Sequence, residues 1–142
     1  MNTDIIARIN LQINAPVPAV WKALTDPAVV KQYFFGTDLV TDWQVGGPIF
    51  FRGEWEGQTY EDKGTVLQYE PQKMLQYDYY SSMSSKPDLP ENYQTITYEV
   101  KPKDGGTLLI ITQTNVPSEE SKEHSEQNWL MVMGEMKKTV ER

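Results

Sequence analysis

Apolar and polar residues alternate along residues 4–14, and a period of two predicts a strand with one buried face. The spacing then changes to the three-and-four pattern of short amphipathic helices over residues 16–24 and 27–36. The sequence TDP at residues 25–27 separates these helices, because proline disfavours helical geometry in the residue before it and fits the first turn of a new helix. The threonine or aspartate before the proline is the expected cap of the second helix.

Residues 37–115 have the pattern of strands and turns almost throughout. Turn signals are the glycine pair at 46–47, a tight hairpin within 54–60 and the sequence KDGG at 103–106. The polar segment 81–92, which contains two prolines, is long for a hairpin loop.

Residues 118–141 are predicted to form one long helix, whose apolar stripe consists of Trp129, Val132, Met133, Met136 and Val140. A curved antiparallel sheet needs a cover for its apolar face, and this is the only predicted helix long enough to provide one. The order of elements therefore predicts an α+β fold. It has a curved antiparallel sheet of six or seven strands, two short helices after the first strand, and a long C-terminal helix across the sheet. We expect one domain over residues 1–142.

Composition and charge narrow the classes of function. The chain has no cysteine, which excludes disulfides and thiolate metal sites. Its 13 basic and 20 acidic residues are interspersed, and the net charge of −7 argues against binding to nucleic acid. No apolar run approaches the roughly 18 residues of a membrane-spanning helix, and the first residues do not have the pattern of a signal peptide. We therefore expect no membrane partner and a cytoplasmic location.

Five segments, in this order, resemble the activator-of-Hsp90-ATPase homologues, a family of the START-like, Bet v 1-like (SRPBCC) group with the helix-grip fold. They are INAPVPAVWKALTDPAVVKQYF, the glycine pair at 46–47, GTVLQYEPQKMLQYDY, ITYEVKPKDGGTLLIITQ and NWLMVMGEMKKTVE. Tyr33 stands where the family usually has tryptophan. The resemblance implies a cavity between the curved sheet and the long helix. Many members of the wider group bind an apolar molecule there, and a few catalyse cyclisation or hydrolysis.

The resemblance also implies a protein partner as an alternative. A two-domain eukaryotic member stimulates the ATPase of the Hsp90 chaperone, and this chain resembles its C-terminal domain alone. A chaperone cofactor or stress-response module would use the outer surface, with the cavity closed or too small.

Aromatic residues are the most informative candidates for a site, because binding pockets are mostly apolar with a few polar groups. Buried Tyr77, Tyr79 and Tyr98 would need hydroxyl partners, which a ligand or water in a cavity would supply. By the resemblance, the face of Gln113 looks into the cavity, and a register slip of one would bring in Arg52 and Glu99 instead. The candidate cavity-lining residues, which would otherwise fill the core, are Trp43, Phe51, Trp55, Tyr60, Tyr77, Tyr79, Tyr98, Gln113, Trp129 and Met133.

The aromatic run Tyr33, Phe34 and Phe35 cannot point inward with all three rings from one short helix. At least one ring should face the mouth of the cavity or solvent. We therefore predict that this run and the segment 81–92 form the entrance to the pocket.

Nothing in the sequence requires catalysis, a cofactor or a metal. The single histidine, His124, lies among glutamates on the predicted long helix, where an exposed residue is expected rather than a base or metal ligand. An enzyme acting on a ring compound would need an acid or base in the pocket, such as a tyrosine or a buried Asp78 or Glu99. The leading expectation is binding of a small apolar or amphipathic molecule by a monomer or homodimer.

Overall fold

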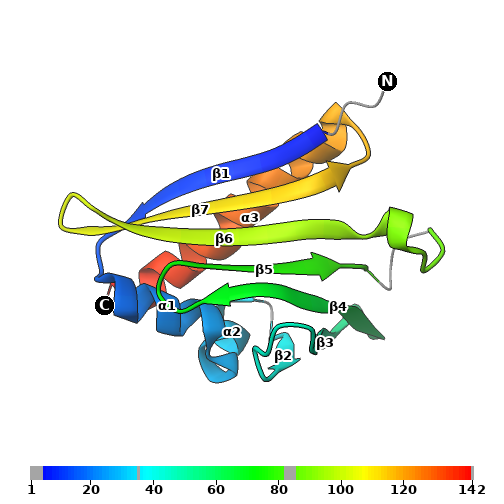
Figure 1. Cartoon of the computed structure of the whole chain (residues 1–142), viewed down its shortest axis with the longest axis horizontal. Helices are drawn as coiled ribbons and strands as arrows, with labels where there is room; N and C mark the ends of the chain where they lie inside the picture. The colour runs from blue at the N-terminus through cyan, green and yellow to red at the C-terminus, as the bar shows by residue number, and fades with distance from the viewer. Residues whose placement is uncertain (1–4, 35, 82–85, 142) are drawn as a thin grey trace.

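The computed structural model describes residues 5–34, 36–81 and 86–141 (Figure 1). The strands are β1 (Ile5–Ile13), β2 (Asp38–Thr41), β3 (Pro48–Trp55), β4 (Gln58–Glu70), β5 (Met74–Tyr79), β6 (Gln94–Lys103) and β7 (Gly106–Val116). The helices are α1 (Val17–Thr25), α2 (Pro27–Tyr33) and α3 (Glu119–Val140), with a short 3-10 helix η1 (Pro90–Asn92).

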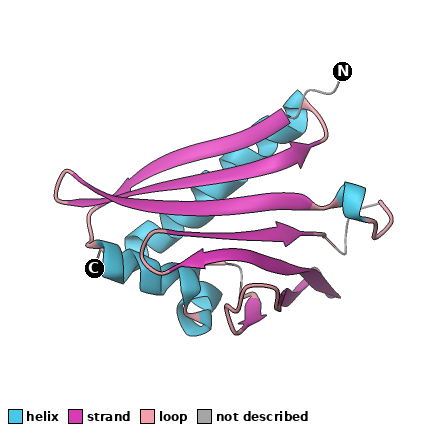
Figure 2. Ribbon diagram, in the orientation of Figure 1, coloured by secondary structure: helices cyan, strands magenta, loops and turns pink. Residues whose placement is uncertain are grey.

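The strands form one antiparallel sheet in the order β1-β7-β6-β5-β4-β3-β2. The first strand therefore lies beside the last, and the hairpins from β2 to β7 extend the sheet from there. Helix α3 runs obliquely across one face, and α1 and α2 lie near one end of it (Figures 1 and 2). This arrangement confirms the predicted helix-grip fold.

The break between α1 and α2 has the predicted cause. Asp26 has extended backbone geometry, with φ −82° and ψ 115°, and its Oδ1 accepts a hydrogen bond from the backbone N–H of Ala28 at 3.0 Å. Pro27 begins α2, where its missing N–H costs no hydrogen bond. The buried face of α1, which includes Val20, Trp21 and Leu24, can therefore turn towards the sheet independently of α2.

Helix α3 covers the apolar core on the side opposite the sheet. Val132, Met133 and Met136 are fully buried and belong to the same apolar cluster as Ile13 and Leu109 of the sheet. Burying each such side chain contributes about 1.5–3 kcal/mol. Ser118 caps the helix by accepting a hydrogen bond from the N–H of Ser121, a contact that the sequence analysis did not predict. Within the part of the chain that the structure describes, no helix is long and apolar enough to cross a membrane.

The predicted turns are present. Glu56 and Gly57 connect β3 to β4 with φ values of 52° and 82°, the geometry of a two-residue hairpin with positive φ at both positions. The segment 81–92 contains η1 towards its end, and residues 82–85 lie outside the described residues.

Candidate functional site: a pocket between the sheet and α3

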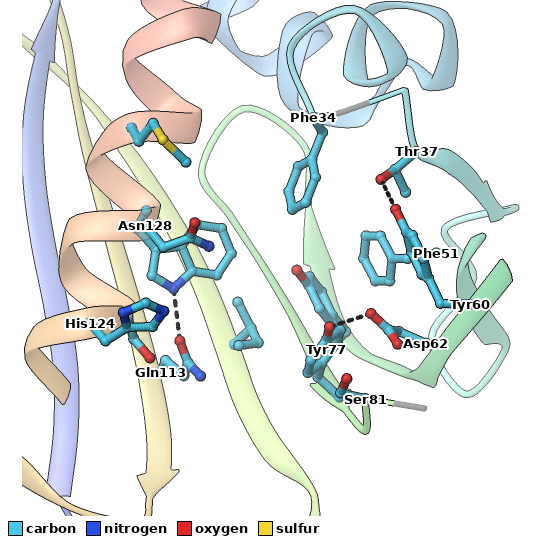
Figure 3. Close-up of a pocket in the computed structure, with 15 residues that line it drawn as sticks. Phe34, Thr37, Phe51, Tyr60, Asp62, Tyr77, Ser81, Gln113, His124 and Asn128 are labelled. Atoms are coloured by element: carbon cyan, nitrogen blue, oxygen red, sulfur yellow. Dashed lines mark hydrogen bonds between the residues drawn. The ribbon is translucent and has the colours of Figure 1, made fainter. Parts of the chain in front are cut away.

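A pocket of about 810 Å³ lies between the sheet and the N-terminal half of α3 (Figure 3). Figure 3 shows His124 and Asn128 on the helix facing Phe34, Thr37 and Tyr60 across the open space. The strands β3 to β7 supply the sheet wall, and the segment between α2 and β2 closes one side.

Aromatic rings form the apolar part of this wall. The ring of Phe51 lies 5.5 Å from that of Tyr77 and 6.3 Å from that of Phe34, centroid to centroid. Alternation along β3 and β5 puts Phe51, Tyr77 and Tyr79 on the helix-covered face. Ile96 lines the pocket from β6, and Trp129 lines it from α3.

Tyr77, which lines the pocket, and Tyr98, which lies behind it, form a hydrogen bond through their hydroxyl groups. The hydroxyls of Tyr77 and Tyr98 are 3.2 Å apart, and both side chains are buried. Burial raises the pKa of Tyr98 to about 12 and raises the pKa of Tyr77 well above its ordinary value. Both phenols therefore stay protonated near neutral pH.

Gln113 connects the sheet to α3. Its Oε1 accepts a hydrogen bond from Trp129 Nε1 at 2.8 Å, and its Nε2 donates to Gln94 Oε1 at 2.8 Å. These two contacts determine which end of the amide faces the helix.

Asp62 places a carboxylate in the sheet wall. Asp62 is only 8% exposed, and Tyr79 Oη donates a hydrogen bond to its Oδ2 at 2.5 Å. Burial, and then the neighbouring carboxylate, raise the pKa of Tyr79 well above its ordinary value, so the phenol remains the donor. Close by, the hydroxyls of Thr37 and Tyr60 form a second pair at 2.6 Å (Figure 3).

The structure brings six of the ten candidate cavity residues to this pocket, together with Phe34 of the proposed entrance. The six are Phe51, Tyr60, Tyr77, Tyr79, Gln113 and Trp129. Tyr98 lies behind them, and its ring packs edge-on against Trp129 at 5.9 Å.

Trp43, Met133 and Tyr33 lie outside the pocket lining. The indole of Trp43 stacks on Tyr69 at 5.4 Å and donates to the carbonyl of Thr25, so it joins the sheet to α1. Met133 is fully buried in the core. Tyr33 is also buried, and its hydroxyl donates to the carbonyl of Ala23 at 2.9 Å. The side chain of Trp55 and the whole of Phe35 lie outside the described residues.

The polar candidates of the register alternative, Arg52 and Glu99, and the carboxylate candidates of the enzyme alternative, Asp78 and Glu99, are not among the residues that line the pocket. Arg52 is exposed and pairs with Glu61 at 2.5 Å. Asp78 accepts a hydrogen bond from the backbone N–H of Thr65 at 2.6 Å, and Glu99 lies between the inward-facing Tyr98 and Val100 of β6. Neither Asp78 nor Glu99 lines the pocket.

Several pocket residues were missed by the sequence analysis. Asp62 could have been found, because alternation along β4 puts it on the same face as Tyr60 and Val66. Ser125, Asn128 and the exposed His124 lie on the polar side of α3, where helical periodicity alone suggests contact with solvent. Within the described ranges, no group of three or more histidine or carboxylate residues could hold a metal ion.

Comparison with known proteins places the chain in a family. The family model described as Activator of Hsp90 ATPase homolog 1-like protein matches residues 14–141. The solved structure of ChR145 from Cytophaga hutchinsonii is 42% identical, with a TM-score of 0.88 over 99% of this chain and 97% of that one. No match was found among curated proteins.

Two further solved structures, below 25% identity, share the fold. DynU16, from the dynemicin biosynthetic locus, is 20% identical with a TM-score of 0.79 over 96% of this chain and 47% of its own. The Aha1 dimer from Colwellia psychrerythraea is 16% identical with a TM-score of 0.74 over 96% of both chains. The family match covers most of the chain and confirms the resemblance, so this protein belongs to the Activator of Hsp90 ATPase homolog 1-like family.

Proposed function

We propose that this protein binds a small apolar or amphipathic molecule in the pocket between the sheet and α3, and that it does not transform it. The observation that carries this proposal is the pocket itself. Its volume of about 810 Å³ falls within the roughly 300–1,000 Å³ of small-molecule sites. Its wall combines aromatic rings with a few oriented polar groups, as such sites do.

The raised pKa values of two pocket tyrosines argue against a role for them as general bases. Tyr77 and Tyr79 have pKa values raised well above the ordinary value, mainly by burial. Each phenol therefore keeps its proton near neutral pH and is a hydrogen-bond donor rather than a general base.

A pair of tryptophan substitutions on α3 tests the proposal. Ser125 is half-buried and lines the pocket, whereas Glu123 is exposed on the same helix and does not. Ser125→Trp should fill the pocket with an indole, and Glu123→Trp should leave it open. The probe is N-phenyl-1-naphthylamine, a neutral apolar dye whose fluorescence rises in an apolar site.

We expect saturable dye binding to the unchanged protein and to Glu123→Trp, and its loss in Ser125→Trp. Equal binding by both variants would place the dye outside the pocket. No binding to the unchanged protein would contradict the proposed function.

A protein-interaction role is the second candidate, supported by the family match over residues 14–141. In this role the chain acts as a cofactor of an Hsp90-type chaperone, as a monomer or, like the Colwellia psychrerythraea Aha1 structure, as a dimer. Chaperone ATPase activity measured with the Ser125→Trp variant separates the candidates. Stimulation that survives a filled pocket would indicate an outer-surface interaction.

A further inference from the structure

The charges around the pocket are unevenly distributed. Among the described residues, the lining contains one carboxylate, Asp62, and no lysine or arginine. The remaining titratable groups of the lining are His124, exposed on the opposite wall, and the phenols of Tyr60, Tyr77 and Tyr79. A buried carboxylate therefore dominates the electrostatics of the sheet wall.

Asp62 is part of the hydrogen-bonded sheet that forms this wall. It lies within β4, directly across the sheet from Phe51 of β3, so the carboxylate and an aromatic ring are neighbours. Tyr79 Oη holds Oδ2 at 2.5 Å, and this charge-assisted hydrogen bond orients the carboxylate. An ionised carboxylate has about four acceptor positions, so it can bind Tyr79 and a ligand donor together.

The hydroxyl groups near Asp62 complete this arrangement. Tyr79 donates its hydroxyl proton to Asp62. The hydroxyls of Thr37 and Tyr60 are engaged with each other at 2.6 Å on the same wall (Figure 3). A ligand with a cationic donor at one end would meet Asp62, and its apolar body would lie against the Phe51 and Trp129 rings.

We infer that the pocket selects an apolar molecule carrying an ammonium or similar cationic hydrogen-bond donor, bound by Asp62, and disfavours molecules ending in a carboxylate. This inference rests on the proposed function and specifies its ligand class. Charges interact strongly where water is excluded, so a cation gains and an anion loses affinity beside Asp62.

Three naphthalene probes with the same ring test the inference. They are 2-naphthylmethylamine, which is cationic at neutral pH, neutral 2-naphthalenemethanol and anionic 2-naphthoate. Dissociation constants are measured by titration calorimetry at fixed pH and salt. The amine should bind at least about tenfold more tightly than the naphthoate.

Asp62→Asn removes the charge and keeps the shape. It should weaken amine binding by about tenfold and change alcohol binding by less than about twofold. The cost of desolvating the amine is the same in both proteins, so the comparison isolates the contribution of the carboxylate. Tyr79→Phe, which keeps the charge, should retain the preference for the amine.

Glu123→Gln is the matched control for net charge, because Glu123 is exposed on α3 and does not line the pocket. It should leave all three affinities unchanged. Equal loss of amine affinity in Glu123→Gln and Asp62→Asn would overturn the inference by assigning the effect to overall charge.

The outcomes separate the inference from the proposed function. If all three probes bind the unchanged protein equally, the inference fails and the proposed function stands. If none binds, both fail. The comparison of amine with naphthoate needs no variant, so equal affinities overturn the inference even if Asp62→Asn does not fold. A preference for the amine that persists at high salt, where the overall charge is screened, supports it.

Discussion

Trp129 Nε1 donates a hydrogen bond to Gln113 Oε1 across 2.8 Å, which joins α3 to β7 at the wall of the pocket. Gln113 is 9% exposed and its amide also donates to Gln94. The long helix is therefore held at the pocket by a directional contact as well as by apolar packing.

Replacing Gln113 tests this contact. Gln113→Leu removes the acceptor of the indole N–H and the donor to Gln94, so the free energy of unfolding should fall by about 1–2 kcal/mol. Urea denaturation measures it. Gln127→Leu, at an exposed position on α3, is the control and should stay within about 0.5 kcal/mol of the unchanged protein. Equal changes in the free energy of unfolding for Gln113→Leu and Gln127→Leu would show that the Trp129–Gln113 hydrogen bond does not contribute to stability.

The buried tyrosines predict a loss of stability at alkaline pH. The folded-state pKa of Tyr98 is about 12, whereas its ordinary value is 10.0, and burial also raises those of Tyr33 and Tyr77. The folded state therefore holds protons that the unfolded state releases. This stabilisation is complete below pH 10 and is lost as the pH rises through the folded-state values.

Phenolate absorbance and circular dichroism, followed together, check this prediction. The buried Tyr33, Tyr77 and Tyr98 should titrate only as the protein unfolds. Tyr98→Phe should reduce the slope of stability against pH above pH 10. Titration of all eight tyrosines in one step with the fold intact would contradict the burial.

Two glutamates, one on α3 and one at its C-terminal cap, bind backbone N–H groups within β1 and directly after it, and predict an acid effect. The Glu126 carboxylate accepts a hydrogen bond from the backbone N–H of Arg8 at 3.0 Å, and the Glu141 carboxylate accepts one from the backbone N–H of Asn14 at 2.8 Å. These backbone hydrogen bonds are the main reason that the pKa of each glutamate lies below its ordinary value of 4.5. Their stabilisation is present above pH 4.5 and is lost as the pH falls through the lowered values.

A Glu126→Gln, Glu141→Gln double variant keeps an acceptor at both positions and removes both charges. Its stability should therefore fall less steeply than that of the unchanged protein below pH 4.5. Denaturant titrations at a series of acid pH values measure the slope. Identical slopes would mean that these two groups do not carry the acid sensitivity.

Substitution of two glycines by alanine should change the free energy of unfolding in opposite directions. A Cβ at Gly64 would lie 1.7 Å from the backbone oxygen of Asp78 on the neighbouring strand, so β4 and β5 would have to separate. We expect Gly64→Ala to lower the free energy of unfolding by about 1–3 kcal/mol.

Gly134→Ala on α3 is the matched substitution, since its Cβ would meet nothing within 4 Å. It should raise the free energy of unfolding by about 0.5–1 kcal/mol, because alanine restricts the unfolded chain and favours the helix. Thermal denaturation of both variants provides the comparison. A neutral Gly64→Ala would contradict the close approach of the two strands.

The sequence predicts the elements well because their signals are local. The break at Asp26 and the hairpin at Gly57 follow from single residues with restricted or unusual backbone preferences. Alternation along β4 is also sufficient to place Asp62 on the same face as Tyr60.

Contacts that depend on packing were not predictable in the same way. A register shift between Val66 and Gln68 in β4 brings Tyr69 onto the helix-covered side, where it meets Trp21 and Trp43. Simple alternation puts Tyr69 on the opposite face from Val66, so the position of Trp43 away from the pocket could not be inferred. His124 joins the pocket because of how α3 crosses the sheet, which residue periodicity does not specify.

The most direct test of ligand binding in the pocket is to detect intermolecular nuclear Overhauser contacts to N-phenyl-1-naphthylamine in the labelled protein. We predict contacts from the dye to Phe34, Phe51 and the indole of Trp129, with none to the indole of Trp43. Contacts confined to surface residues outside the pocket, or no saturable binding at all, would contradict the proposed function.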